Sequence, residues 1–273
     1  MQDSLNDLIK KLKSLEIQGA KEVAIESLKF LRKLAKKKGF GKAFEQAARK
    51  IEKTRPTEVV LHNCLEIVKR EKNVKTINKL ISQLNQATKE IAKRGSRLIK
   101  DGYKIMTHCH SGEALAVIEQ AWKDGKKITV YATETRPKEQ GIKTARELSK
   151  KGIHVFLIVD DAIDYFIKDV DIVMVGSDAI RKEGVVNKIG TCTLAEIAKN
   201  HKKPFYVVGD TLKLDKRKRL IIEMRSPQEI YKENIKILEE KNPAFDITPW
   251  KYIKRVVTEK GIMTPANVLR MLK

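Results

Sequence analysis

From residue 103 to residue 209 the sequence alternates between short apolar runs and longer amphipathic segments, and this rhythm constrains the fold more than any other feature. The apolar runs are YKIMTH (103–108), KITVYAT (127–133), IHVFLIV (153–159), VDIVMVG (170–176) and PFYVVG (204–209). Each run is apolar on both faces, as are parallel strands covered by helices. The intervening segments have helical spacing and span 111–126, 138–152, 161–169 and 190–203. The pattern predicts an α/β fold, with a Rossmann-like parallel-sheet domain over 101–273.

Residues 1–100 have a different pattern, in which apolar positions recur at intervals of three and four. A glycine at 39 and a proline at 56 interrupt this pattern, as helix ends do. The expected helices cover 5–15, 21–38, 41–55, 57–71 and 74–102. No strand pattern occurs in this part of the sequence. We therefore predict an all-helical N-terminal domain over 1–100, followed by the sheet domain.

Composition limits the class of protein. Of the 273 residues, 41% are hydrophobic, which permits a core, yet no apolar run reaches the ~20 residues of a membrane span. The N-terminus lacks the apolar segment of a signal peptide. Three cysteines in a chain of this length do not indicate a disulfide framework. We expect a cytoplasmic protein with no membrane partner.

The net charge of +22 raises the question of nucleic acid binding. The lysines are scattered over helix ends and turns, and aromatic residues are only 5% of the chain. This distribution favours a solvated, lysine-rich surface, which is also typical of proteins from hot environments. Nucleic acid stays the less favoured partner.

Polar residues follow every predicted strand. Because the carboxyl ends of parallel strands lie at one edge of the sheet, where open α/β sheets bind ligands, this convergence predicts a site there. The residues are His108, Cys109, His110 and Ser111, then Thr133–Pro137, Asp160 and Asp161, Ser177 and Asp178, and Asp210, Thr211 and Lys213.

Cys109 is the most reactive candidate at this edge. A helix that begins near Ser111 would favour a thiolate through its dipole, and protonated His108 or His110 would lower the thiol pKa further. The alternatives are a buried thiol without chemistry and a zinc ligand. Consecutive residues on a strand point to opposite faces, and no second Cys/His pair is present, so we expect no metal and no cofactor.

Asp178 is the acid–base candidate, although an aspartate there also suits a helix cap. Cationic donors accompany it. Arg55 and Arg136 each precede a proline in a TRP tripeptide, which suits phosphate binding, although a surface ion pair is the alternative. Asn187 and Lys188 precede a helix that opens at Thr191, and Lys213 adds another ammonium group. The set suggests a phosphorylated, hydroxylated ligand.

Several motifs together resemble one family. THCHSGEAL, TETRPKEQG, VGSDAI, VNKIGT and NPAFDITP look like the family that unites the regulatory subunits of translation initiation factor 2B, 5-methylthioribose-1-phosphate isomerase and archaeal ribose-1,5-bisphosphate isomerase. The resemblance runs from LEIQGA to EKGIMTP. It implies a helical domain, a Rossmann-like domain and a homodimer.

The resemblance also implies residue roles. In the isomerases a cysteine of a THC motif and an aspartate of a GAD motif carry the reaction, and these match Cys109 and Asp178. An arginine of an RGA motif, one of a TRP motif and an NK pair hold phosphate in the isomerases. This chain departs from the family at the first of these, with Gln18 in place of the arginine. The expected ligand-binding residues are Gln18, Gly19, Ala20, Lys21, Arg55, His110, Ser111, Arg136, Asn187, Lys188 and Lys213.

Three functions follow as hypotheses. The first is an isomerase that converts an aldose 1-phosphate, of the ribose-1,5-bisphosphate type, to the ketose. Asp178 would assist ring opening and Cys109 would take the C2 proton. The second is a regulatory subunit that binds initiation factor 2, with its site empty or reading a nucleotide monophosphate. The third is a nucleic acid binder, which rests on net charge alone.

Overall fold

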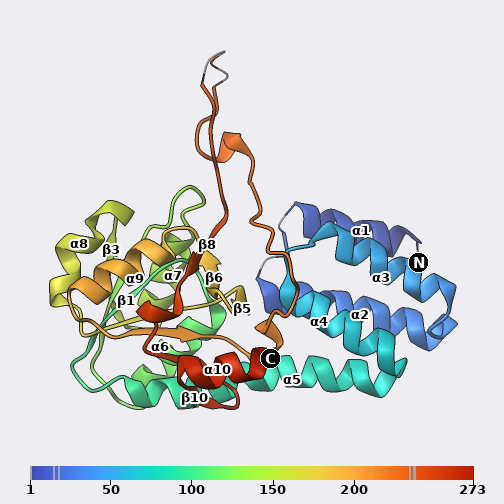
Figure 1. The fold of residues 1–273 in the computed structure, drawn as a ribbon, viewed down its shortest axis with the longest axis horizontal. Helices are drawn as coiled ribbons and strands as arrows, with labels where there is room; N and C mark the ends of the chain where they lie inside the picture. Colours follow the sequence, from blue (N-terminus) through green and yellow to red (C-terminus); the bar gives the residue numbers. More distant parts are fainter. Residues whose placement is uncertain (1, 15, 18, 234, 236–237) are drawn as a thin grey trace. The chain divides into compact units, whose positions relative to one another are not determined.

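The computed structural model describes residues 2–14, 16, 17, 19–233, 235 and 238–273. Contacts divide the chain into two compact units, Met1–Ala87 and Thr88–Lys273 (Figure 1). The division falls inside one helix, α5 (Val74–Gly95), whose last two turns pack on the sheet: Ile91 lies in a core cluster with Ile105 and Val117. The predicted boundary at residue 100 stays a prediction.

The first unit is helical, with α1 to α4 followed by the greater part of α5. Four leucines with no exposed surface form much of its interior, namely Leu12, Leu28, Leu31 and Leu65. They recur at helical spacing on the inward faces. The helices are α1 (Gln2–Lys13), α2 (Ala20–Lys38), α3 (Lys42–Thr54) and α4 (Val59–Glu71).

The second unit is built on a seven-stranded sheet with strand order β10-β9-β7-β4-β1-β2-β3. All neighbours in this sheet are parallel except β9 and β10, which are antiparallel. The α/β prediction is confirmed. The strands are β1 (Lys104–Thr107), β2 (Thr129–Thr133), β3 (His154–Ile158), β4 (Ile172–Val175), β7 (Phe205–Val208), β9 (Arg255–Thr258) and β10 (Gly261–Met263).

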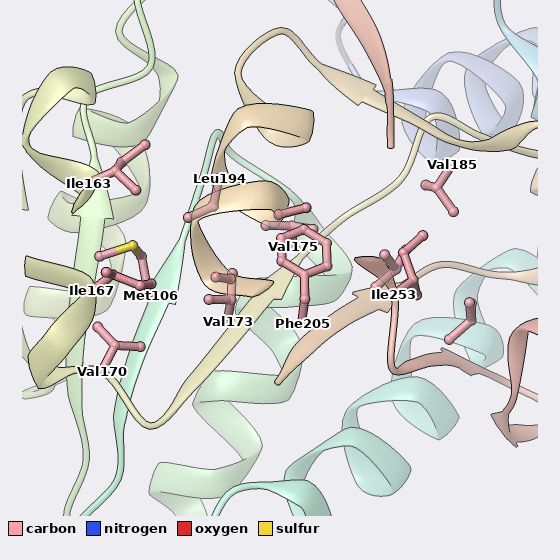
Figure 2. Packing of buried hydrophobic residues seen from close by; sticks show 14 of the residues in the cluster. Met106, Ile163, Ile167, Val170, Val173, Val175, Val185, Leu194, Phe205 and Ile253 are labelled. Atoms are coloured by element: carbon pink, nitrogen blue, oxygen red, sulfur yellow. The ribbon is translucent and has the colours of Figure 1, made fainter. Parts of the chain in front are cut away.

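Alternate residues of each central strand enter two different cores, because side chains point to opposite faces in turn. Met106 and Val173 pack with residues of α8 (Ile163–Phe166) and α9 (Thr191–Asn200), and Figure 2 shows this face. Ile105 and Ile172 pack on the other face with α6 (Gly112–Lys123) and α7 (Gln140–Ser149). This explains why the strands are apolar on both faces.

Several parts differ from the sequence-based expectation. The segment 161–169 is not one helix: the short α8 is flanked by 3-10 turns at Asp160–Ala162 and Ile167–Asp169. Strand β3 is an edge of the sheet, so His154, Phe156 and Leu157 are exposed. A second, antiparallel sheet of β5 (Ala179–Arg181), β6 (Gly184–Lys188) and β8 (Phe245–Thr248) has no counterpart in the prediction, nor has α10 (Pro265–Leu272).

Residues 216–233 leave the sheet as an extended arm, and residues 238–243 return to it (Figure 1). The arm exposes apolar side chains, among them Ile221 and Met224. None of the helices in the described part of the chain is long and apolar enough to cross a membrane.

Candidate functional site

The loops after β1, β4 and β7 form the centre of the candidate site, because these three strands are neighbours in the sheet with β4 in the middle. Cys109 lies in the loop after β1 and Asp178 in the loop after β4. The charge of Asp178 acts on the Cys109 thiol, as does that of Lys188. The fold therefore brings together a thiol, a carboxyl group and an ammonium group.

Cys109 has an unusual backbone, with φ of 67° in the left-handed region. Two threonine hydroxyl groups hold it there. The backbone N–H of Cys109 donates to Oγ1 of Thr135 (2.8 Å), and Oγ1 of Thr144 donates to the Cys109 carbonyl oxygen (2.8 Å). These two hydrogen bonds fix the main chain of Cys109 and thereby the direction in which its half-buried side chain leaves the loop.

The thiol is not activated in the way that the sequence suggested. Burial raises the pKa of Cys109 to about 11. The positive charge of Lys188 opposes this rise, while Asp178 and Asp160 add to it. The expected lowering of the thiol pKa is therefore wrong, because loss of solvent outweighs the favourable charges.

The two flanking histidines do not supply a positive charge either. Burial lowers the pKa of His108, and burial followed by the charge of Lys143 lowers that of His110. Both ring nitrogens of His108 lie within hydrogen-bonding distance of protein oxygens, namely Oγ1 of Thr133 (2.7 Å) and the carbonyl of Ile189 (2.8 Å). His108 is thus a structural link between two loops, and its nitrogens are not placed for a metal.

Asp178 is half-buried and lies immediately before a strand, β5, and not at the start of a helix. Its backbone N–H donates to the carbonyl of Val186 (2.8 Å), which joins it to the β5–β6 hairpin. The helix-cap interpretation is therefore wrong. The Asp178 charge raises the pKa of Lys213, as it raises that of Cys109, so the carboxyl group acts on both side chains from the loop between β4 and β5.

The anion site expected at the start of α9 is already filled by a carboxylate. Asp246 Oδ2 accepts the backbone N–H groups of Gly190 (2.8 Å) and Cys192 (3.0 Å). Nearby, Asn187 is buried and its Nδ2 donates to Oγ1 of Thr191 (3.0 Å). Lys188 is less confined, with Nζ 5.3 Å from the centre of the Phe245 ring. Of these groups, Lys188 is the one whose positive charge acts on the Cys109 thiol.

Lys213 is not an open ammonium group. Its side chain is 3% exposed, and Nζ donates to Oε1 of Glu113 at 2.7 Å. Ser111 caps α6, with Oγ accepting the Ala114 N–H (3.3 Å). Both residues therefore hold the loops in place, and the ammonium group that Lys213 adds is already paired with Glu113.

Arg136 and its neighbours organise the loop after β2. Asp160 accepts the N–H groups of Thr135 (2.9 Å) and Arg136 (2.7 Å). The exposed guanidinium group of Arg136 pairs with Glu139 (3.3 Å). The surface ion pair, which was the alternative interpretation, is what the structure contains.

The remaining predicted residues belong to the helical unit. Gly19 has φ of 84° and precedes α2, whose first residues are the buried Ala20 and the half-buried Lys21, while Gln18 lies outside the described residues. Arg55 follows α3 and pairs with Glu58 at 2.5 Å. Its buried Nε and Nη1 have no hydrogen-bond partner among the residues that the structure describes. Arg55 therefore retains donors for an anion.

One group in the helical unit has the atoms of a metal site. Ligand atoms of Glu52, His62 and Glu66 lie within 4.8 Å of one another. Lys69 Nζ already lies 3.0 Å from each of the two carboxylates. The lysine thus holds the position that a cation would take.

Sequence reasoning missed four supporting residues of the site. Thr144, Glu113, Asp246 and Ile189 were given no role, because each forms its contact with a residue that is 35 to 100 positions away in the sequence. For one of them the sequence offered a signal, because Thr144 is a polar residue on the otherwise apolar face of a helix.

Comparison with known proteins shows the family of this chain. The model described as initiation factor 2 subunit family matches residues 16–265. A ribose 1,5-bisphosphate isomerase from Methanocaldococcus jannaschii is 38% identical over 284 residues, which cover 96% of this chain and 92% of that protein. A methylthioribose-1-phosphate isomerase from Thermoanaerobacter sp. is 39% identical over 272 residues, covering 86% and 78%.

A solved structure has the same fold. The translation initiation factor eIF-2B of Pyrococcus horikoshii matches with a TM-score of 0.86 and 29% identity, covering 97% of this chain and 98% of that one. Since the family model spans residues 16–265 and the relatives match along nearly the whole chain, this protein belongs to the initiation factor 2 subunit family.

Proposed function

We propose that this protein is an isomerase that converts an aldose 1-phosphate to the corresponding ketose, with ribose-1,5-bisphosphate as the type of substrate. The observation that carries the proposal is that Cys109 and Asp178 follow neighbouring strands, β1 and β4, with the charge of Asp178 acting on the thiol. Relatives named ribose 1,5-bisphosphate isomerase, at 38% and 39% identity, support the substrate class.

The chemistry needs an acid and a base in the same site. A sugar phosphorylated at its anomeric carbon cannot open its ring unless an acid protonates the ring oxygen. A base must then remove the C2 proton, and an acid must return a proton to C1. With the pKa of Cys109 raised to about 11, the free thiol holds its proton at neutral pH.

Transfer of that proton from the thiol to the Asp178 carboxylate supplies both groups at once. Asp178 then gives the proton to the ring oxygen, and the Cys109 thiolate takes the C2 proton. The resulting enol is protonated at C1 by the Cys109 thiol, while Asp178 takes the proton of the C2 hydroxyl group. Lys188 stabilises the thiolate, as its effect on the thiol pKa indicates. The cycle returns both side chains to their ionisation states after proton transfer.

The phosphate ligands are proposed from their available donors. Arg55 has two buried nitrogens without partners among the described residues, which suits charge-assisted hydrogen bonds to phosphate oxygens. Lys188 and Asn187, at the end of β6, are the next proposed phosphate ligands, with an ammonium group and a side-chain amide. Gly19, Ala20, Lys21 and His110 stay predicted ligand contacts, and Gln18 stays one outside the described residues.

The test is an NMR assay of the purified protein with ribose-1,5-bisphosphate and with methylthioribose-1-phosphate. We expect one ketose product, and we expect Cys109→Ser and Asp178→Asn each to lower kcat by about 10²–10⁴-fold, as loss of an acid–base group does. Cys192→Ser, a matched change in a half-buried cysteine of α9, should keep full turnover. Undiminished turnover in the Cys109 variant would contradict the proposed roles.

The competing function is binding to initiation factor 2, and the match to a protein named translation initiation factor eIF-2B is what favours it. Absence of turnover with both sugars, together with salt-resistant retention of purified initiation factor 2 on the immobilised protein, would replace the isomerase proposal. Binding of a nucleotide monophosphate without turnover would point the same way.

A homodimer is the proposed assembly. The supporting feature is an aromatic patch at the β3 edge, formed by Phe156, Tyr165 and Phe166 around Tyr131. Phe156 is 44% and Tyr165 73% exposed, while the ring centres of Tyr131 lie 4.9 Å from Phe156 and 5.8 Å from Phe166. Aromatic side chains are enriched in protein interfaces, and a second copy of this chain is the proposed occupant.

A further inference from the structure

The ion pair between Lys213 and Glu113 joins elements that follow two strands which are not neighbours. Glu113 is in the first turn of α6, after β1, and Lys213 ends the turn Thr211–Lys213, after β7. Strand β4 lies between β1 and β7 in the sheet. The pair therefore spans the end of β4, where the Asp178 loop begins.

The Asp178 loop is confined on both sides at this point. Gly176 lies so close to Ser111 that a methyl group there would overlap the serine hydroxyl. Gly209 packs against Ser177 on the other side, and a methyl group on it would come within 3.1 Å of Lys213 Cδ. Ser177 Oγ also donates to the carbonyl of Val208 (3.1 Å). The Asp178 loop is therefore closely packed against Ser111 on one side and against Gly209 on the other.

The pair is buried and ionised. The side chains of Lys213 and Glu113 are 3% and 10% exposed. The pKa of Glu113 is lowered despite its burial, by the charge of Lys213, and the pKa of Lys213 is raised despite its burial, by the charge of Glu113. Asp210, also buried, adds a second carboxyl group beside Lys213. A buried pair of this kind seldom contributes much net stability, so a role in geometry is the better explanation for it.

We propose that Lys213 and Glu113 form a clasp that holds the Asp178 loop in a fixed position against the Cys109 loop, and that both are positioning residues of the isomerase site and not phosphate ligands. The proposal rests on the proposed function for its kinetic consequence. Cys109 is four residues before Glu113 on one side of the clasp, and Asp178 acts electrostatically on Lys213 on the other. Opening the clasp separates the two reacting groups without removing either.

The kinetic test compares two variants with a control. Lys213→Met leaves Glu113 buried and unpaired, which can prevent folding, so the informative protein is the double variant Lys213→Met/Glu113→Leu, in which the buried volume stays filled. We expect its kcat for ribose-1,5-bisphosphate to fall by about 10²-fold with KM nearly unchanged, since a small displacement of reacting groups has that effect. The control is Lys151→Met, which removes the ion pair between Lys151 and Glu119. Glu119 lies in α6, as Glu113 does, and this variant should leave kcat unchanged.

A rise in KM with kcat unchanged in the double variant would overturn the clasp and return Lys213 to phosphate binding. Lys213→Arg keeps a cation beside Glu113 and should recover most of the lost kcat. No recovery, with the arginine variant folded, would also contradict the clasp.

A second measurement separates the clasp from the proposed function. In a Cys192→Ser background the fully buried Cys64 is shielded, so the alkylation rate of the folded protein reports on Cys109. The double variant should alter this rate several-fold and the Lys151→Met control should not. If the wild type turns over no sugar phosphate, the proposed function fails. The alkylation rate of Cys109 in the double variant still tests whether Lys213 and Glu113 hold the two loops together. An unchanged rate would overturn the clasp.

Discussion

At the scale of single residues, the site contains backbone conformations that residues other than glycine rarely adopt. Cys109 and Thr135 have φ of 67° and 63°, and each such residue costs about 1–3 kcal/mol. They support one another, since the Thr135 hydroxyl accepts the Cys109 N–H and also lies 3.1 Å from the Thr133 hydroxyl. Strain of this kind persists where surrounding hydrogen bonds over-determine the geometry, which suits the role proposed for the Cys109 thiol.

Asp246 provides a test of buried charge at the same scale. Burial raises the pKa of Asp246 from 3.8 to about 6, and its Oδ1 is buried with no partner in the part of the chain that the structure describes. Because the folded state binds this proton more tightly than the unfolded state, the associated stability is complete below pH 3.8 and is lost as the pH rises through about 6.

We therefore expect Asp246→Asn to remove the decrease in free energy of unfolding that ionisation of Asp246 causes as the pH rises. Urea unfolding of wild type and variant between pH 4 and pH 7.5 measures it: the wild type should lose free energy of unfolding relative to the variant as the pH rises. The same change at the exposed Asp161 is the control for loss of a negative charge. Asp210, with a pKa also raised by burial to about 6, is present in all three proteins and cancels. Parallel pH profiles for wild type and Asp246→Asn would contradict the assignment.

At the scale of elements, glycines set how closely helices approach the sheet. Gly141 lies in the first turn of α7, and a methyl group there would overlap the carbonyl oxygen of Thr133 at the end of β2. That contact brings Thr144, one turn further along α7, to the Cys109 carbonyl. The docking of one helix thus reaches the candidate site.

Replacement of Gly141 by alanine should lower the free energy of unfolding by at least about 2 kcal/mol, because the backbone must move to admit the methyl group. Gly112 is the matched control: it also lies in the first turn of a helix, α6, with no atom within 4 Å of an added Cβ. Gly112→Ala should change stability by less than about 1 kcal/mol. Equal urea midpoints for the two variants would show that α7 is not held this closely.

At the scale of the whole molecule, the two edges of the large sheet are unlike. β10 is a short strand of three residues, whereas β3 is a five-residue strand beside the aromatic patch. Exposed edge strands with apolar side chains invite pairing with another chain. The net charge of +22 opposes non-specific association at low salt, so a contact between copies needs a specific apolar surface.

We expect Tyr165→Glu to shift the protein from dimer toward monomer in light scattering coupled to size exclusion. Tyr165 is 73% exposed, so the change should not affect folding. Ile262→Glu introduces the same charge at a 38% exposed residue of the opposite edge strand, β10, and should leave the mass unchanged. A dimer that survives Tyr165→Glu but dissociates with Ile262→Glu would move the interface to the other edge.

The sequence by itself determined the order and type of the main elements. Apolar periodicity is a local property, so five of the six parallel strands and most helices were readable from it, together with the set of polar residues at the strand ends. Tertiary structure alone decided what those residues are chemically. Lys213 meets Glu113 across 100 positions, Asp246 reaches α9 from more than 50 away, and burial sets the pKa of Cys109. Desolvation and pairing depend on neighbours in space, and for that reason the Lys213 ammonium group is a buried partner of Glu113 and the Cys109 thiol keeps its proton.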